Sequence, residues 1–250
     1  MATILVTGGT GTLGKEVCAR LRSSGQDVRV LSRRSPEHPV DLREGTGLDR
    51  AVDGVDAIVH CASTPRGGDD QAAAHLLRAA GERGVPHLVY ISIVGVDRVP
   101  LGYYRVKRRV EQMIEEAGRT HPGLGWTVLR TTQFHDLVLR LLAGAARLPV
   151  LAVPAGVSVQ PIDVREVAQR LADLAVGPPA GRVADMGGPE VRFFDDLAKL
   201  YLSTTHRRRA VLPVRLAGRA YAGFRAGGHL APEQSVGKVT FTEFLHRGAG

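Results

Sequence analysis

The chain has 250 residues, of which 44% are hydrophobic and 5% aromatic, and its formal net charge is +8. This length is sufficient for one α/β domain with a sizeable, mostly aliphatic core. No apolar run approaches the roughly 18 residues of a transmembrane helix, and the N-terminal apolar run is too short for a signal peptide. Cys18 and Cys61 form no C-x-x-C pair, which argues against a disulfide framework or a zinc site. We therefore expect a reduced, cytoplasmic protein with no transmembrane segment and no metal site.

The N-terminal stretch predicts a strand, a glycine turn and a helix. Residues 2–6 are apolar, and Gly8, Gly11 and Gly14 follow at the spacing G-x-x-G-x-x-G. Gly8 allows a sharp turn, Gly11 a close approach of a pyrophosphate, and Gly14 close packing of the helix on the strand. The helix N-terminus offers N–H groups to the phosphates. A glycine turn is a weak signal alone, but in this context it predicts a dinucleotide site that includes Gly8, Thr10, Gly11, Thr12, Leu13 and Gly14.

The end of the second predicted strand, residues 27–31, bears on the choice of cofactor. It is followed by Ser32, Arg33 and Arg34, where an acidic residue would bind the adenosine 2′-hydroxyl of NAD. Arginine instead pairs with a 2′-phosphate, so this segment predicts NADP(H). The alternative is a pair of solvated arginines at a strand end.

Two further segments complete the predicted nucleotide site. Residues 38–42 are typical of a short edge strand, with Asp41 and Leu42 beside the adenine. Residues 56–61 predict a buried strand, and the small side chains of Cys61, Ala62 and Ser63 allow a cofactor to lie across its carboxyl end.

The order of predicted elements indicates a doubly wound parallel sheet. Strands at 87–92 and 126–130 alternate with helices at 69–83 and 103–117, which implies crossovers that cover both faces. We predict one NAD(P)-binding domain, with a nucleotide-binding core over 1–150 and a small substrate-side lobe over 151–250. The lobe is expected to contain strands at 157–162 and 182–186 and helices at 164–175 and 194–202.

Tyr103 and Lys107 form a Y-x-x-x-K pair on one face of the fourth long helix. A lysine ammonium beside a phenol lowers the tyrosine pKa, so Tyr103 is predicted to exchange a proton with a substrate oxygen during hydride transfer. Lys107 is also predicted to hold the nicotinamide ribose, and Ser92 to hydrogen-bond the same substrate oxygen. The alternative is a core tyrosine and a solvated lysine. The chain has only four lysines, which favours the functional interpretation.

These motifs together resemble the atypical short-chain dehydrogenases/reductases, and within them the NmrA-like NAD(P)H-binding group. The resemblance rests on residues 7–14, 90–96 and 126–130 and on the Tyr103/Lys107 pair, and it covers residues 2–190. It implies a Rossmann fold, NADP binding, and in active members Tyr and Lys as a proton relay with Ser as helper. The resemblance therefore predicts an NADP-dependent reductase or dehydrogenase of a small carbonyl or hydroxyl compound.

The sequence departs from this family at one point. Active members usually carry an asparagine at the start of the helix after the fourth strand, and this chain contains none; Asp69 lies nearest that place. Two other functions stay open, namely a redox sensor that binds NADP(H) without turnover and an epimerase or dehydratase that keeps its nicotinamide bound.

The segment after residues 126–130 is expected to border the substrate. The resemblance implies that Thr132, Gln133, Phe134 and His135 lie near the nicotinamide, although an anchoring role in the loop is an equal alternative. A basic tail over 206–225 predicts an amphipathic helix that contacts an acidic partner or a membrane surface, or only a solvated face. Basic and aromatic residues form no compact stripe before this tail, so we expect a small-molecule substrate and no nucleic acid. A homodimer is left open.

Overall fold

The computed structural model describes residues 1–33, 35, 38–64 and 67–247. The chain divides into two compact units. Unit 1 comprises Met1–Ser92, Gly102–Arg130 and Arg165–Ala184, and unit 2 comprises Ile93–Leu101, Thr131–Val164 and Asp185–Gly250. The chain thus passes between the units several times, because successive strands of unit 1 feed loops into unit 2.

Unit 1 is built on a seven-stranded sheet in the order β3-β2-β1-β4-β5-β6-β9. The pairings of β1 with β2 and β4, and of β4 with β5, are parallel. The strand order reverses between β1 and β4, which in such sheets opens a crevice at the carboxyl ends. The strands are β1 Thr3–Thr7, β2 Asp27–Ser32, β3 His38–Pro39, β4 Ala57–His60, β5 His87–Ile93, β6 Gly125–Thr131 and β9 Gly181–Arg182.

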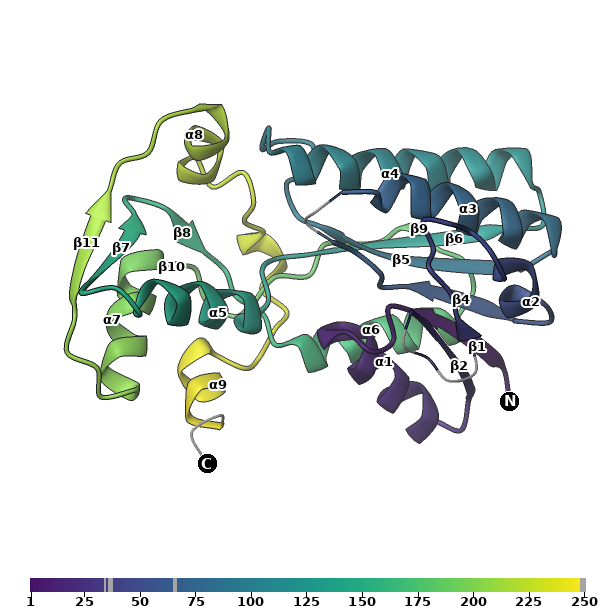
Figure 1. Ribbon diagram of the computed structural model, residues 1–250, viewed down its shortest axis with the longest axis horizontal. Coiled ribbons are helices and arrows are strands. Elements are labelled where there is room, and N and C mark those ends of the chain that lie inside the picture. The colour runs from purple at the N-terminus through teal and green to yellow at the C-terminus, as the bar shows by residue number, and fades with distance from the viewer. Residues whose placement is uncertain (34, 36–37, 65–66, 248–250) are drawn as a thin grey trace. The chain divides into compact units, whose positions relative to one another are not determined.

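Helices cover both faces of this sheet, as the alternation of elements predicts. Figure 1 shows α3 and α4 on one face and α1 and α6 on the other. Apolar residues such as Leu5, Leu76 and Ile114 are fully or almost fully buried between the sheet and α3 and α4. The helices of this unit are α1 Thr12–Ser23, α2 Leu48–Val52, α3 Asp69–Glu82, α4 Gly102–Thr120 and α6 Val164–Val176.

Unit 2 combines short strands with helices. Parallel strands β7 and β11 form one two-stranded sheet, and antiparallel β8 and β10 form another. Leu151, Leu197 and Phe241 belong to its buried core. Its elements are α5 His135–Ala145, β7 Val150–Pro154, β8 Ser158–Val159, β10 Arg192–Phe193, α7 Phe194–Thr204, β11 Ala210–Val214, α8 Arg219–Arg225, the 3₁₀ helix Pro232–Gln234 and α9 Phe241–Arg247.

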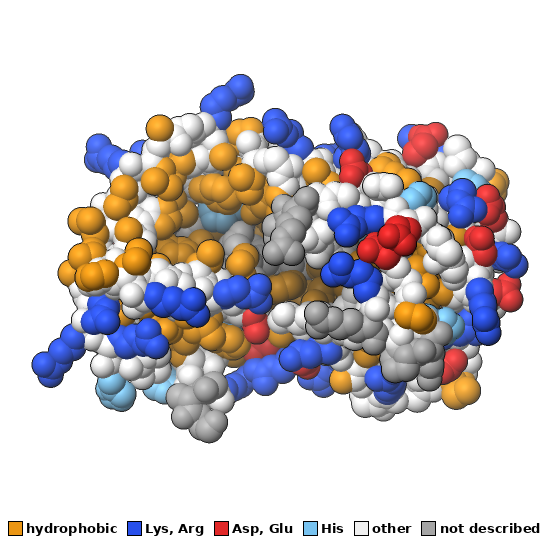
Figure 2. Space-filling view, in the orientation of Figure 1, with side chains coloured by type: hydrophobic (Ala, Val, Ile, Leu, Met, Phe, Trp, Pro, Cys, Tyr) orange, Lys and Arg blue, Asp and Glu red, His pale blue; other side chains and the backbone are white. Residues whose placement is uncertain are grey.

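Exposed apolar side chains are concentrated on unit 2. Leu141, Leu148 and Leu212 each keep half or more of their surface exposed. Figure 2 shows hydrophobic side chains gathered over β7 and β11. Among the described residues, no helix is both long and apolar enough to span a bilayer.

The structure corrects the prediction of a continuous basic helix near the C-terminus. Residues 210–214 form strand β11, which pairs with β7 from Ala210–Val150 to Val214–Pro154, and only Arg219–Arg225 are helical. Pro213 lies within this stretch and does not favour a helix. The sequence analysis predicts no helix where α5 lies. Its apolar residues follow directly on residues 132–135, which are predicted to border the substrate and not to begin a helix.

Candidate functional site

A cavity of about 460 Å³ opens at the carboxyl ends of the strands in unit 1. It is lined by the segments that follow β1, β2, β3 and β4, together with the first residues of α3. This is the crevice that the reversal of strand order creates between β1 and β4. The lining residues are Gly8, Thr10, Gly11, Leu31, Ser32, Arg33, Val40, Asp41, Leu42, Arg43, Cys61, Ala62, Ser63, Thr64, Gly68, Asp69 and Ala72.

The glycine turn forms one wall of this cavity, and two of its glycines are required by packing. Gly8 has a positive φ of 64°, and a Cβ there would lie 2.8 Å from Ala62 Cα. A Cβ at Gly14 would overlap the carbonyl oxygen of Gly8. Gly11 precedes α1, which has no side-chain cap and no acidic residue in its first turn. The helix N-terminus is thus open toward an anion, as a dinucleotide pyrophosphate requires.

Three charged side chains lie at the end of the cavity beside β2 and β3. Asp41 accepts a hydrogen bond from the Arg43 backbone N–H at 3.0 Å, and its carboxylate lies 3.6 Å from Arg43 Nε. These hydrogen bonds, with the charges of Arg43 and Arg33, lower the pKa of Asp41. Two arginines therefore flank one carboxylate at the place where the sequence predicts a 2′-phosphate.

Most of the residues predicted to bind the cofactor lie together on the cavity wall. These are Gly8, Thr10, Gly11, Ser32, Arg33, Asp41, Leu42, Cys61, Ala62 and Ser63. Thr12, Leu13 and Gly14 instead form the first turn of α1 behind it, and Arg34 lies outside the described residues. Lys107 is buried and does not line this cavity. The cavity volume, the open helix end and the arginines fit a nicotinamide dinucleotide.

Tyr103 contacts the cavity wall through a serine. Its hydroxyl lies 2.7 Å from Ser63 Oγ, and Ser63 Oγ donates a hydrogen bond to Asp69 Oδ2 at 2.5 Å. Burial raises the pKa of Tyr103; the hydrogen bond with Ser63 lowers it and the charge of Asp69 raises it. The sequence-based expectation that Lys107 lowers this pKa differs from the structure, because the ammonium faces elsewhere.

Lys107 is almost completely buried on the inner face of α4. Its Nζ donates a hydrogen bond to the Ile91 carbonyl oxygen at 3.0 Å and lies 4.6 Å from the centroid of the Tyr90 ring. Burial lowers the pKa of Lys107 to about 8, although the negative charges of Asp69 and Glu111 oppose this shift. The ammonium is therefore poised to lose its proton slightly above neutral pH.

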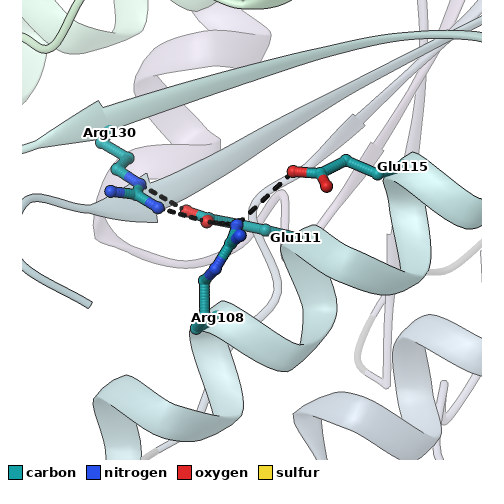
Figure 3. A network of polar contacts seen from close by, with 4 residues as sticks. All are labelled: Arg108, Glu111, Glu115 and Arg130. Atoms are coloured by element: carbon teal, nitrogen blue, oxygen red, sulfur yellow. Dashed lines mark hydrogen bonds and ion pairs between the residues drawn. The ribbon is translucent and has the colours of Figure 1, made fainter. Parts of the chain in front are cut away.

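Ser92 lies at the end of β5 and is buried, and the ion pair of Glu111 and Arg130 is buried as well. Glu111 receives a bidentate contact from Arg130, with Nε at 2.7 Å and Nη2 at 2.6 Å, and a further hydrogen bond from Arg108 at 2.8 Å (Figure 3). Burial would raise the pKa of Glu111, but the hydrogen bonds and charge of Arg130 and the hydrogen bond of Arg108 bring it below its ordinary value. The Ser92 hydroxyl oxygen is buried and has no hydrogen-bond partner among the described residues.

The predicted substrate residues lie in unit 2, where two of them hold backbone segments. Thr132 Oγ1 donates to the Gln160 carbonyl at 2.5 Å and accepts from the Gly188 N–H at 3.2 Å. The fully buried His135 has Nε2 2.9 Å from the Val239 carbonyl oxygen. Phe134 precedes α5 and bridges to Ile162, and Gln133 is half-buried before it. Their role toward a substrate stays a prediction.

Two residues of this region have no predicted role from the sequence. Arg43 lines the cavity, and Glu111 is buried one helical turn beyond Lys107. A signal for Glu111 is available, since Tyr103, Lys107 and Glu111 repeat every four residues. Arg43 carries no comparable pattern. Asp69, which lies nearest the place of the family's asparagine, lines the cavity.

Comparisons with known proteins agree on a nicotinamide-binding chain. A family model described as NAD(P)H-binding matches residues 8–140. A (4-alkanoyl-5-oxo-2,5-dihydrofuran-3-yl)methyl phosphate reductase of Streptomyces griseus is 34% identical over 200 residues, which cover 75% of this chain and 68% of the relative. A divinyl chlorophyllide a 8-vinyl-reductase of Cucumis sativus is 25% identical over 224 residues, with 74% of this chain but only 52% of the relative covered.

A solved structure shares the fold over the whole chain. The NADPH-dependent quinone oxidoreductase of Escherichia coli complexed with NADPH has a TM-score of 0.83 and 18% identity, and the match covers 99% of this chain and 100% of that one. At this identity the likeness shows the fold alone.

Proposed function

Because this chain belongs to the NAD(P)H-binding family of atypical short-chain dehydrogenases/reductases, we propose that it is an NADPH-dependent reductase of a small carbonyl compound. One observation supports this most directly. The Tyr103 hydroxyl lies one hydrogen bond from Ser63, a residue of the cavity wall. A phenol at this position has the chemistry of a general acid and lies beside the crevice in which the family's nucleotide binds.

The side chains of unit 1 have separable roles in this proposal. The turn around Gly11 and the first turn of α1 hold the pyrophosphate, and Arg33 pairs with the adenosine 2′-phosphate. Tyr103 gives its proton to the substrate oxygen. Lys107, whose ammonium donates to the Ile91 carbonyl oxygen, is carried forward as the residue predicted to hold the ribose. When bound, NADPH supplies a hydride to the substrate carbon. Ser92 is still predicted to hydrogen-bond the substrate oxygen.

The raised pKa of Tyr103 suits an acid that must keep its proton until the substrate oxygen takes it. Arginine at the 2′-phosphate position supports NADPH rather than NADH, since a carboxylate beside the 2′-hydroxyl is the usual NAD arrangement. Asp41 lies close to this place, but the charges of Arg33 and Arg43 flank it.

Replacement of Tyr103 by Phe tests the proposal. We expect kcat for NADPH-dependent reduction to fall by at least about a hundredfold across a panel of an unsaturated lactone, a benzoquinone and an aromatic aldehyde. The NADPH dissociation constant, measured by fluorescence, should stay within about twofold because Tyr103 is not on the cavity wall. Tyr104→Phe is the matched control, since it removes the neighbouring hydroxyl and should retain turnover. Unchanged turnover in Tyr103→Phe would exclude the tyrosine from the mechanism.

A wild-type protein that binds NADPH and reduces no member of the panel contradicts the reductase function. That outcome favours a sensor that binds the nucleotide without turnover.

A further inference from the structure

The two serines near Tyr103 differ in what they contact. Ser92 is 1% exposed, and its hydroxyl oxygen has no hydrogen-bond partner among the described residues. Ser63 lines the cavity and lies 2.7 Å from the Tyr103 hydroxyl. The serine expected from the resemblance therefore makes no hydrogen bond to the phenol in the described part of the chain, whereas a serine after β4 does.

The direction of the hydrogen bonds around Ser63 follows from Asp69. The Asp69 carboxylate accepts from Ser63 Oγ through Oδ2 and from the Thr64 backbone N–H at 2.9 Å through Oδ1. A serine hydroxyl has a single proton, so Ser63 that donates to Asp69 can only accept from Tyr103. The phenolic proton therefore points to Ser63 before a substrate binds.

We propose that Ser63 and Asp69, in place of Ser92, are the positioning residues that control the proton of Tyr103. Before transfer, Asp69 accepts a hydrogen bond from the Ser63 hydroxyl and Ser63 accepts one from the phenol, which fixes the phenolic oxygen. When the Tyr103 proton passes to the substrate oxygen, the Ser63 hydroxyl turns from Asp69 to donate to the new phenolate. One O–H bond breaks at Tyr103 and one forms at the substrate oxygen, and solvent later returns the proton to Tyr103.

This arrangement gives the phenol opposite electrostatic environments before and after transfer. The negative charge of Asp69 favours the protonated phenol, whereas a hydrogen bond donated by Ser63 stabilises the phenolate. Asp69 is buried at the start of α3 with both oxygens bonded, so its position is fixed. Neighbouring Asp70 instead pairs with Arg109 near the surface at 3.3 Å, and therefore lacks this role.

Other charges around the site also affect its titration. Lys107 is faced by Asp69 from α3, by Glu111 on its own helix, and by Cys61 and His60 at the end of β4. The Tyr90 ring of β5 lies beneath its ammonium. Asp69 and Ser63 are the side chains bonded in sequence to the Tyr103 hydroxyl in the part of the chain that the structure describes, so variants of these two residues test its effect.

The first experiment follows the ionisation of Tyr103 in the free protein. The ultraviolet absorbance of phenolate is recorded as a function of pH for each protein. The same titration is made on that protein with the additional substitution Tyr103→Phe. The difference between the two curves is the ionisation of Tyr103. Asp69→Asn should lower the pKa of Tyr103 by about one unit, and Ser63→Ala should raise it. Asp70→Asn, which removes the same charge from the adjacent residue, should leave it unchanged. If the pKa of Tyr103 stays the same in Asp69→Asn or in Ser63→Ala, the proposal is overturned, whether or not the protein is a reductase.

The second experiment rests on the proposed function and compares the two serines in turnover of the same carbonyl panel with NADPH. Ser63→Ala should lower kcat by about tenfold to a hundredfold, the value of a hydrogen bond to a charged group. Ser63→Thr retains the hydroxyl and should restore most of the rate, whereas a purely structural defect would not be rescued. Ser92→Ala should lower kcat by less than Ser63→Ala does, because Ser63 makes the contact with the Tyr103 hydroxyl. A larger loss in Ser92→Ala than in Ser63→Ala assigns the helper role to Ser92 and overturns the inference.

Discussion

The two units of this chain bury polar groups in different ways. Among the described residues, unit 1 buries four Asp, Glu, Lys or Arg side chains, Asp69, Lys107, Glu111 and Arg130, of which Asp69 lines the nucleotide cavity, whereas unit 2 buries one, Asp163. In unit 2, Gln160 and His135 are fully buried and bind backbone carbonyls of distant segments. Buried charges are expensive unless paired, whereas backbone hydrogen bonds cost little to satisfy. The comparison teaches that unit 1 places charge where chemistry is proposed, while unit 2 uses polar groups to hold its segments together.

The largest effect is expected from the buried pair of unit 1. Glu111→Gln keeps the shape of the side chain but leaves Arg130 buried without a counter-charge, so the free energy of unfolding should fall by about 3–5 kcal/mol. Chemical denaturation measures this change. Glu115→Gln is the control, since Glu115 is partly exposed and lies 3.4 Å from Arg108; its effect should be below about 0.5 kcal/mol. A loss in Glu111→Gln as small as that of the control would contradict the distinction between the units.

A smaller loss is expected from the corresponding change in unit 2. Gln160 Nε2 donates to the carbonyls of Gly188 and Ala231, and its Oε1 accepts from the Ala231 N–H at 2.8 Å. Gln160→Leu should lower the free energy of unfolding by about 2–4 kcal/mol because these backbone groups lose their partner. The exposed Gln169→Leu serves as the control.

The NADPH dissociation constant should change by less than about twofold in Gln160→Leu, because every residue of the cavity wall belongs to unit 1. Calorimetric titration of the folded variant checks this. A large loss of affinity would show that the hydrogen bonds of unit 2 also serve the nucleotide.

Each unit also buries a histidine whose pKa falls far below its ordinary value, His60 in unit 1 and His229 in unit 2. Burial, with the charge of Lys107, lowers the pKa of His60 to about 3; burial, with the charge of Arg98, lowers that of His229 to about 4. In the unfolded chain each takes up a proton near pH 6.5, so the stabilising contribution is complete above that pH and is lost as the pH falls toward the folded value. At about pH 5, each histidine should therefore have lowered the free energy of unfolding by about 2 kcal/mol.

Denaturation at about pH 7.5 and about pH 5 tests this linkage. His60→Gln and His229→Leu should each reduce the pH-dependent loss by about 2 kcal/mol, and together by roughly twice as much if the units respond independently. An unaltered pH dependence in either variant means that its histidine is protonated or exposed in the folded protein.

The smallest effect concerns the choice of nucleotide. Arg33→Ala should weaken NADPH by roughly tenfold, since a solvated arginine–phosphate contact contributes about 1–2 kcal/mol, and should change NADH binding by less than twofold. Arg29→Ala is the control, because Arg29 binds the Ala51 and Asp53 carbonyls away from the cavity. Equal losses for both nucleotides would refute the 2′-phosphate assignment.

Local patterns made much of unit 1 predictable. The helix periodicity of Leu13, Val17 and Leu21 needs only neighbours four residues away, and all three are buried. Strand β9, at Gly181–Arg182, overlaps the predicted strand at 182–186 but is shorter, and it lies at the edge of the sheet. Unit 2 was less predictable, because β7 and β11 pair residues about sixty apart in sequence and neither has a periodicity of its own to reveal a partner.

The sequence by itself determined the glycine turn, the alternation of strands and helices, the Tyr103/Lys107 spacing and membership of the family, because each depends on residues close together in the chain. Tertiary structure alone decided which charges are buried. Nothing near Glu111 in the sequence indicates that Arg130 pairs with it, and nothing in the sequence indicates that Ser63 joins Asp69 to Tyr103. Their contacts arise where the ends of β4, β5 and β6 meet α3 and α4. The strength of a charge depends on the solvent that the assembled fold removes from it, and no local pattern records that.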